Sequence, residues 1–355
     1  MLAGFSGLAE LAAHQRGLFP PPGPDLRAAL RDALGVLDLR VRDVRVERRW
    51  TDAGGGLSGE ELSWTVGFGP RTRAYLLRPR DTAGPLPGVV AMHCHAGMKW
   101  AGKEKIADGP RPPSAEVLRL RRRLYGGRAY ACELARRGFA VLVHDVFAWG
   151  SRRPPLGRHR ADDYDRAARE HEHVVAKVCA VLGTSFAGVL ASEDLAAAAY
   201  LRSRPDIASV AAIGLSGGGA RAALLGALDP GIGAVAVAAM VSSFRDLREE
   251  HVAAHSWMLF PPGLTRLADW PHVVACRAPG PLLVLYALDD PLFPEPGMRR
   301  AHALITEVYQ DAPRGYTGLF FSAPHCFDIP MQEAAFAWLA DRRAGPHEAE
   351  GVRSP

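Results

Sequence analysis

From residue 86 onward, short apolar runs alternate with helical patterns, and this alternation constrains the fold more than any other feature of the chain. Each apolar run is bounded by Gly, Pro or Asp, as expected for strands buried on both faces. The runs are Gly88–His93, Phe139–Val146, Val210–Leu215, Ala234–Met240, Leu282–Leu288 and Gly318–Ser322. The helical patterns between them are Gly127–Arg137, Ala187–Arg202, Gly217–Leu228, Gly297–Gln310 and Met331–Arg342. The alternation predicts an α/β fold in which helices flank a mostly parallel sheet.

The first 80 residues follow a different pattern. Two short helices are expected on either side of a proline-rich break at 20–24, with Asp25 capping a helix over Leu26–Leu37. Two stretches that alternate apolar and polar residues, Val41–Trp50 and Glu61–Arg80, predict an antiparallel pair at the edge of the sheet. We therefore expect an N-terminal helical extension over 1–40, a single α/β domain over 41–345 and a flexible tail over 346–355.

Two segments of the domain, at about 147–183 and 241–280, are longer than ordinary loops. Long insertions after the strands of an open α/β sheet lie over its carboxyl edge, where ligands bind. Both segments are therefore expected to be lid-type inserts that build a substrate pocket. Their large apolar residues are the candidates for its walls: Phe147, Trp149, Phe244, Trp257 and Met258.

The composition excludes several classes of protein. With 48% hydrophobic and 23% charged residues among 355, the chain can form a core and is neither disordered nor fibrous. The net charge of +5 is mild, and the densest basic run, within 119–128, has no nucleic-acid motif, so no nucleic-acid partner is expected. Nowhere do eighteen apolar residues run together, so no membrane span is expected.

The cysteines and the N-terminus bear on the cellular compartment. The five cysteines are odd in number, widely spaced and without a CxxC pair, which indicates neither a disulfide framework nor a zinc knuckle. The first residues lack the basic start and long apolar core of a signal peptide. We therefore expect a cytoplasmic protein that acts on a small molecule, with homo-oligomerisation left open.

The sharpest motif is Gly214-Leu215-Ser216-Gly217-Gly218, which follows an apolar run and opens a helical pattern. A strand-to-helix elbow forces the serine into a strained turn, so the residues two positions on either side must be small. The hydroxyl then projects beyond the sheet edge, and the N-terminus of the following helix helps to stabilise an oxyanion. Ser216 is therefore the candidate nucleophile.

A second segment, Gly183-Thr184-Ser185-Phe186-Ala187, partly matches the same pattern. The stretch before it, His171–Leu182, is longer and more polar than a central strand should be. Ser185 is therefore interpreted as the cap of the helix that begins there rather than as a nucleophile.

A serine nucleophile needs a base and an orienting acid, which follow it along the chain in this type of fold. Asp289 and Asp290 come directly after an apolar run, ahead of a proline-rich turn. Alternate residues that leave a strand point in opposite directions, so only one of the two can face the base. His325 follows the last apolar run, in the loop where the base belongs. Together these residues predict a Ser–His–Asp hydrolase site.

The oxyanion hole is expected to combine the backbone N–H of Gly217 with one from the loop His93–Gly97. The small residues of that loop allow close backbone approach, and the N–H of His95 is the candidate second donor. His93 and His95 could instead bind a metal, since alternate residues of an extended chain share a side. His251 and His255, at i, i+4 spacing, raise the same question. Spacing identifies no third ligand, so no metal site is expected.

These motifs together resemble the α/β-hydrolase superfamily, and within it the dienelactone hydrolase and acetyl-xylan-esterase-like branch. The resemblance covers about 86–340 and rests on His93–Gly97, Gly102–Lys105, Gly183–Gly188, Gly214–Gly218, Asp290–Pro294 and Pro324–Phe327. It implies an eight-stranded sheet, no metal or organic cofactor, and ester hydrolysis through an acyl-enzyme. It also favours Asp290 over Asp289, because the spacing to Phe293-Pro294 matches the acid-bearing turn of the superfamily. Dienelactone hydrolases use a cysteine where this chain has Ser216, which favours the esterase side.

The predicted function is therefore hydrolysis of a carboxylic ester by a serine esterase. Thioesters, lactones and small amides require the same machinery, so the triad alone does not choose among them. One alternative is a biosynthetic enzyme of the same fold that performs acyl transfer, cyclisation or lactone chemistry. A second is a serine peptidase or amidase. A third is a binding protein without activity, in which an intact triad would be unexpected.

Overall fold

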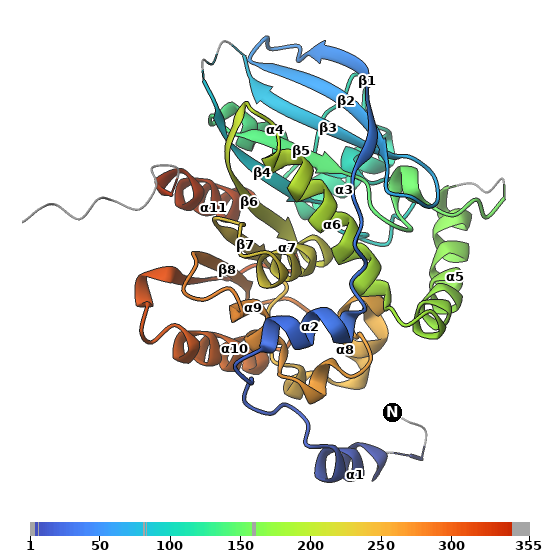
Figure 1. The fold of residues 1–355 in the computed structure, drawn as a ribbon, viewed down its shortest axis with the longest axis vertical. Helices are drawn as coiled ribbons and strands as arrows, with labels where there is room; N and C mark the ends of the chain where they lie inside the picture. The colour runs from blue at the N-terminus through green and yellow to red at the C-terminus, as the bar shows by residue number, and fades with distance from the viewer. Residues whose placement is uncertain (1–3, 6, 81, 83, 158–160, 343–355) are drawn as a thin grey trace, which may run out of the picture.

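The computed structural model describes residues 4–5, 7–80, 82, 84–157 and 161–342, so the expected tail over 346–355 lies outside the described residues. Nine described strands form one sheet in the order β1-β2-β3-β5-β4-β6-β7-β8-β9 (Figure 1). Their bounds are β1 Arg42–Thr51, β2 Leu57–Thr65, β3 Thr72–Pro79, β4 Leu86–Met92, β5 Ala140–His144, β6 Ile207–Leu215, β7 Val235–Ala238, β8 Leu282–Ala287 and β9 Tyr316–Phe321. Strands β4 to β9 run parallel to one another, and β1, β2 and β3 extend the sheet antiparallel beyond β5. The predicted α/β fold is confirmed.

The described sheet has one strand more than the eight that the family resemblance implied. The expected strand Glu61–Arg80 is in fact two strands, β2 and β3, joined by a turn. In this turn Gly67 and Gly69 adopt φ angles of 98° and 65°, which glycine tolerates at no steric cost, and Pro70 follows. The apolar–polar alternation continues on both sides of the turn, so the alternation alone did not reveal it.

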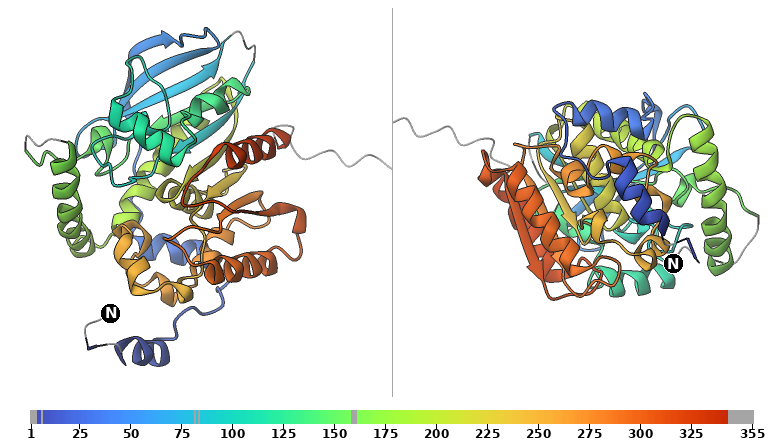
Figure 2. Two further views of the ribbon diagram at one scale, coloured as in Figure 1. Left: turned by 180° about the vertical axis from the view of Figure 1, so that it is seen from behind. Right: turned by 90° about the horizontal axis from the view of Figure 1, so that it is seen from below.

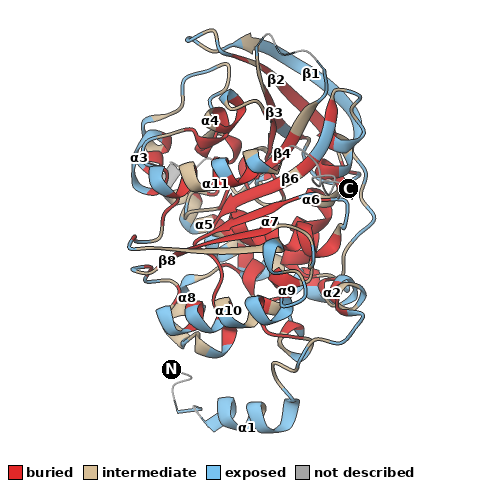
Figure 3. Ribbon diagram, turned by 90° about the vertical axis from the view of Figure 1, so that its left-hand side faces the viewer, coloured by how far each residue is buried: buried red, intermediate tan, exposed pale blue. Residues whose placement is uncertain are grey.

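Helices cover both faces of the sheet (Figure 3). One face carries α6 (Phe186–Arg202), α7 (Gly217–Leu228), α9 (Trp270–Ala275) and α10 (Glu295–Val308), and the other carries α3 (Ala115–Leu124), α4 (Tyr130–Arg136) and α11 (Ile329–Asp341). Neighbouring residues of one strand contribute to opposite cores, as Val89 and Val90 of β4 do. This two-sided burial explains why the central strands read as continuous apolar runs.

The N-terminal extension contains two helices with different surroundings. α1 (Gly7–Arg16) has no buried residue and lies apart from the sheet in each view (Figures 1 and 2). α2 (Leu26–Leu34) buries its leucines and contacts α6 and α7. It ends before the predicted Leu37, because Gly35 adopts a φ of 63° and its N–H bonds back to the last turn. Asp25 occupies the N-cap position as predicted, but its side chain makes no capping hydrogen bond.

The two long segments follow β5 and β7, at the carboxyl edge of the sheet. The first contains η2 (Gly150–Arg152) and α5 (Ala161–Val181), and the second contains η3 (Phe244–Asp246), α8 (Glu249–Ala254), η4 (Trp257–Leu259), η5 (Leu264–Arg266) and α9. They meet at Glu172 of α5, whose Oε1 accepts hydrogen bonds from Ser256 Oγ at 2.6 Å and from the N–H of Trp257 at 3.0 Å. The two inserts are therefore one joined structure at this edge.

Within the described part of the chain, no single helix is both long and apolar enough to cross a membrane. α5 and α6 reach that length and hydropathy only as a pair, with a bend of 82° between them.

Candidate active site

Ser216 lies at the junction of β6 and α7, at the carboxyl edge of the sheet. Its backbone has a φ of 54° and a ψ of −124°, a conformation that costs a residue other than glycine about 1–3 kcal/mol. Its N–H donates to the carbonyl oxygen of Ala238 at 2.9 Å, and its own carbonyl accepts from the N–H of Ala220 at 2.8 Å. The turn is therefore held on both sides, while Ser216 itself remains partly exposed.

Two glycines make this strained turn possible. A Cβ added at Gly214 would lie 2.3 Å from the carbonyl oxygen of Gly218. A Cβ added at Gly218 would lie 2.1 Å from the carbonyl oxygen of Met92, at the end of β4. Both distances are far inside van der Waals contact and involve backbone atoms in a closely packed region. The small residues that the elbow motif requires are thus a steric necessity here.

His325 and Asp290 form a pair at the same edge of the sheet as the elbow. His325 follows β9 and Asp290 follows β8, and Nδ1 of His325 lies 2.6 Å from Oδ2 of Asp290. The side chain of Asp290 is completely buried, and its Oδ1 accepts from the N–H of Leu292 at 2.8 Å. A carboxylate only accepts, so Nδ1 carries the hydrogen of this pair and Nε2 of the neutral ring is left as an acceptor.

Asp289 points elsewhere. It is exposed, and its backbone N–H donates to the carbonyl oxygen of Ala323 at 3.0 Å. The structure therefore brings Asp290, and not Asp289, against His325. Among the residues described, the Ser216 hydroxyl makes no hydrogen bond to His325; in ligand-free enzymes this contact is often long and tightens when substrate binds.

The loop after β4 lies beside the first residue of α7. A Cβ added at Gly217 would lie 3.7 Å from side-chain atoms of both Cys94 and His95. The buried Lys105 donates from Nζ to the carbonyl oxygens of Cys94 at 2.7 Å and His95 at 3.0 Å. The N–H of His95 belongs to the same trans peptide as the Cys94 carbonyl and so points away from Lys105. The N–H of His95 is therefore not directed at Lys105, and it belongs to the loop that lies beside Gly217.

Lys105 closes the short 3-10 turn η1 (Lys103–Lys105) and is fully buried. Burial lowers the pKa of Lys105 to about 8, because the charged ammonium loses its hydration. Gly102–Lys105 is among the motifs that carry the family resemblance, but the contacts of Lys105 become visible only in the fold.

A buried ion-pair network lies behind the same loop. Arg221 of α7 is 1% exposed; it donates from Nη1 to the carbonyl oxygen of His93 at 2.9 Å and from Nη2 to Asp194 of α6 at 2.6 Å. Asp194 also lies 2.9 Å from Nε2 of His144, at the end of β5. Burial would raise the pKa of Asp194, but Arg221 and His144 outweigh it and lower this pKa to about 2. Sequence reasoning missed this network, although Arg221 is the one charged residue in the apolar pattern of α7.

The two histidines of the loop each have other partners. His93 is fully buried, with Nε2 3.8 Å from Oδ1 of Asp145, and burial lowers its pKa well below the usual range. His95 packs its ring 5.6 Å from that of Trp149, and its Nδ1 accepts from the N–H of Gly97 at 3.2 Å. Over the described ranges, no group of three or more His, Cys, Asp or Glu residues is arranged to hold a metal ion.

The histidines of the second insert support its turns. Nδ1 of His251 accepts from the N–H of Arg248 at 2.9 Å and closes the first turn of α8. The ring of His255 lies 4.6 Å from that of Phe293, and burial lowers the pKa of His255 to about 4. His255 therefore packs against the turn that carries both Asp290 and Phe293. The ring of Phe293 lies 6.4 Å from that of His325.

Three of the expected pocket residues, Trp149, Trp257 and Met258, lie in the two inserts. Met258 is buried, and its Sδ lies 3.2 Å from the point where a Cβ on Gly217 would be. Trp149 is fully buried and contacts His95. Trp257 is 39% exposed and donates its indole N–H to Nδ1 of His173 at 2.8 Å. Of the three, Met258 is the one that packs against the elbow.

The other two lie in different surroundings. Phe147 packs against Phe68 and Phe186 and lines a separate cavity of about 190 Å³. Phe244 is buried in the second insert, where its ring stacks on that of Trp270 at 5.7 Å with an interplanar angle of 2°. The contacts of Phe244 are those of a core residue.

Ser185, the competing serine, caps α6. Its Oγ accepts from the N–H of Gly188 at 2.9 Å and donates to the carbonyl oxygen of Leu34 at 2.9 Å. The interpretation of this serine as a helix cap is confirmed.

Comparisons with known proteins show which of them this chain is similar to. No family model matches the sequence. The chain is 26% identical over 239 residues to the proposed hydrolase YtaP of Bacillus subtilis (strain 168), across 66% of this chain and 71% of the relative. This chain thus shares a moderate sequence similarity with a bacterial protein named as a hydrolase.

Solved structures match more of the chain at lower identity. A proposed acetyl xylan esterase from Bacteroides fragilis NCTC 9343 has a TM-score of 0.68 at 16% identity, over 89% of this chain and 82% of that one. A glucuronoyl esterase from Solibacter usitatus has a TM-score of 0.60 at 15% identity, over 91% and 92%. Acetyl xylan esterase 1 from Thermoanaerobacterium sp. JW/SL YS485 has a TM-score of 0.59 at 15% identity, over 92% and 96%. The chain therefore has the α/β-hydrolase fold, in the form that these esterases share.

Proposed function

We propose that this protein hydrolyses carboxylic esters with Ser216 as nucleophile, His325 as base and Asp290 as orienting acid. The observation that carries the proposal is the 2.6 Å contact between His325 and the buried Asp290, at the sheet edge where the strained elbow exposes Ser216. The three residues follow one another along the chain in the order that this fold uses for its triads.

The acylation step uses groups of this chain alone. Ser216 Oγ attacks the ester carbonyl while Nε2 of His325 accepts its proton, and Asp290 stabilises the imidazolium through Nδ1–H. The negative oxygen of the tetrahedral intermediate is stabilised by the N–H groups of Gly217 and His95. The intermediate collapses when the bond to the alcohol oxygen breaks and His325 returns the proton to that oxygen.

Deacylation repeats the same chemistry with water. His325 removes a proton from the water that attacks the acyl-enzyme, and the acid leaves as Ser216 Oγ regains the proton. Similar structures are named as acetyl xylan, glucuronoyl and methyl esterases, which supports esters over amides as the substrate class. We extend the proposal to a small-molecule ester whose acyl group lies beside Met258.

A fluorophosphonate probe and a panel of substrates test the proposal. Peptide mapping should locate the probe on the peptide that contains Ser216, and Ser216→Ala should abolish labelling and lower kcat by several orders of magnitude. p-Nitrophenyl esters should be turned over and peptide p-nitroanilides should not. Ser203→Ala, at an exposed serine outside the site, serves as the matched control and should keep full activity.

Two results would contradict the proposal in different ways. A label on the Ser185 peptide would move the nucleophile, and turnover of amides in preference to esters would favour the peptidase alternative. Labelling of Ser216 without turnover of either class would favour acyl transfer or another biosynthetic reaction.

A further inference from the structure

A second cavity lies away from the proposed triad, between the antiparallel strands and the loops after β4 and β5. Its volume is about 570 Å³, and its walls come from β2, β3, the segment 100–117 and the segment 150–153. None of Ser216, Asp290 and His325 lines it. Its ligand would therefore be held apart from the atoms that react in ester hydrolysis.

The lining carries more positive than negative charge. Four cationic side chains, Arg73, Lys103, Arg111 and Arg153, face two carboxylates, Glu61 and Glu104. Both carboxylates are already paired, because Glu61 accepts from Arg73 at 3.1 Å and Glu104 accepts from Lys103 at 2.6 Å.

For the other two cationic side chains, Arg111 and Arg153, the lining offers no further carboxylate. Arg153 donates to the carbonyl oxygens of Trp100 at 3.1 Å and Gly150 at 3.2 Å, which are neutral acceptors. Within the part of the chain that the structure describes, neither Arg111 nor Arg153 has a carboxylate partner. Two guanidinium charges are thus free to bind an anion, for which their planar forks of N–H donors are suited.

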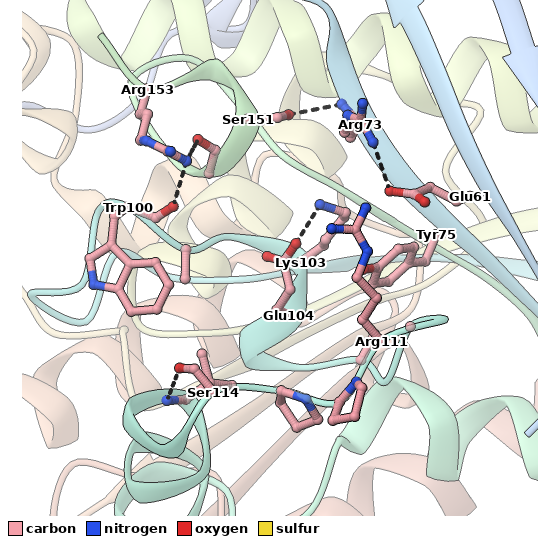
Figure 4. A pocket seen from close by; sticks show the side chains of 17 residues that line it. Glu61, Arg73, Tyr75, Trp100, Lys103, Glu104, Arg111, Ser114, Ser151 and Arg153 are labelled. Atoms are coloured by element: carbon pink, nitrogen blue, oxygen red, sulfur yellow. Dashed lines mark hydrogen bonds and ion pairs between the residues drawn. The ribbon is translucent and has the colours of Figure 1, made fainter. Parts of the chain in front are cut away.

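The cationic side chains line different sides of this cavity. Figure 4 shows the side chain of Arg111 extending toward Lys103, with Arg73 and Glu61 on one side and Trp100 and Arg153 on the other. Glu61 already compensates Arg73 and Glu104 already compensates Lys103, so Arg111 and Arg153 are the lining cations left for an anion. An anionic group here would compensate these two charges and gain charge-assisted hydrogen bonds.

The wall of the cavity around Lys103 and Tyr75 is closely packed. The Lys103 side chain is only 4% exposed, and it lies 3.2 Å from the buried carboxylate of Asp145 as well as beside Glu104. Burial would lower the pKa of Lys103, but these carboxylates outweigh it and raise this pKa above its ordinary value. Gly109 packs so closely on Tyr75 that an added Cβ would lie 2.3 Å from the Tyr75 hydroxyl oxygen. This wall is therefore formed before a ligand binds, whereas the side chains of Arg111 and Arg153 are exposed.

We propose that this cavity binds a small molecule through a carboxylate or phosphate group, held by Arg111 and Arg153 above the fixed Lys103. Trp100 supplies an aromatic surface at the rim for the rest of the ligand (Figure 4). The proposal does not depend on hydrolysis at Ser216, so it can be tested in a Ser216→Ala background as well.

Isothermal titration calorimetry of the full chain with inorganic phosphate and with malonate tests the proposal. Chloride keeps the ionic strength constant, so that screening does not change between injections. We expect saturable binding of at least one anion at one site per chain. The anion that binds more tightly identifies whether the natural ligand presents phosphate or carboxylate.

Variants connect that binding to this cavity. Arg111→Gln and Arg153→Gln should each weaken binding by about tenfold, since each loses charge-assisted hydrogen bonds to the anion. Arg314→Gln, at an exposed arginine outside the cavity, should bind as the parent does. The proposal is overturned if neither anion saturates a site, or if Arg111→Gln and Arg153→Gln bind with the affinity of Arg314→Gln.

Discussion

Arg221 of α7 donates a hydrogen bond of 2.9 Å to the carbonyl oxygen of His93, where β4 ends. The helix that begins at the proposed nucleophile is tied in this way to the loop that carries His95. The same guanidinium pairs with Asp194, and both side chains are buried. The charge of each is therefore compensated by its protein partners instead of by water.

Replacing Arg221 with Met leaves Asp194 buried beside His144 without its strongest partner. We expect Arg221→Met to lower the free energy of unfolding by about 3–5 kcal/mol, as measured by urea denaturation. Asp194→Asn added to this variant removes the uncompensated charge and should restore part of the loss. A double variant no more stable than Arg221→Met would show that charge compensation is not the reason for the network.

Asp290→Asn should lower kcat by about 10²–10⁴, because an amide no longer holds the productive tautomer of His325 or stabilises its charged form. Asp289→Asn is the matched control, since this neighbouring carboxylate is exposed and does not contact His325. Its kcat should stay within about tenfold of the parent. Both variants are assayed on one activated ester, and the reverse ranking would refute the assignment of the acid.

Gly218→Ala should destabilise the protein, because the new methyl group would lie 2.1 Å from the carbonyl oxygen of Met92. We expect a loss of about 1–3 kcal/mol in the free energy of unfolding, typical of an overpacked site. Gly233→Ala is the control, since its methyl group would meet its nearest neighbour at an ordinary 3.7 Å. That variant should stay within about 1 kcal/mol of the parent. Equal stabilities would contradict the close packing of the elbow on β4.

Lys105 should give the stability of this protein a dependence on pH. Its pKa is about 8 in the folded chain and returns to the ordinary value of 10.5 on unfolding, so between these values the unfolded state binds more protons. The titration of Lys105 therefore raises the free energy of unfolding as the pH increases across this window. Below pH 8 Lys105 is protonated in both states, so its contribution no longer changes with pH. Urea denaturation of the parent and of Lys105→Met should reveal a stability difference that grows in favour of the parent from pH 8 to 10.5.

The exposed Lys177 of α5 provides the control for this experiment. Lys177→Met should show a constant stability difference from the parent over the same window. If Lys105→Met also shows a constant stability difference, the pKa of Lys105 is not lowered in the folded protein.

Truncation of Met258 should change the substrate preference, whereas truncation of Phe244 should change the stability. Met258→Ala opens space beside Gly217, so kcat/KM for longer acyl chains should rise relative to acetate by about tenfold. Phe244→Ala removes a stacked core ring and should lower the free energy of unfolding by about 3–5 kcal/mol without changing that preference. A changed preference in Phe244→Ala alone would place the acyl pocket beside Phe244 and not beside Met258.

The order of strands and helices and the elbow at Ser216 were readable from the sequence because each rests on local patterns. Two-sided burial makes a central strand an apolar run, and the strained turn demands small residues at 214 and 218. The turn at Gly67–Pro70 was missed because the alternation of residues does not change across it.

The charged contacts around the site were decided by the tertiary structure. Arg221 meets Asp194 across 27 positions of sequence and the carbonyl of His93 across 128, and Glu172 meets Ser256 across 84. A single charged residue in an apolar pattern shows that a partner is needed, since a buried charge is costly alone. Which residue becomes that partner depends on how the helices pack on the sheet, and that packing is a property of the whole fold. The sequence by itself therefore determined the fold class and the candidate triad, whereas the packing of α6, α7 and the inserts decided how the loop after β4 is held.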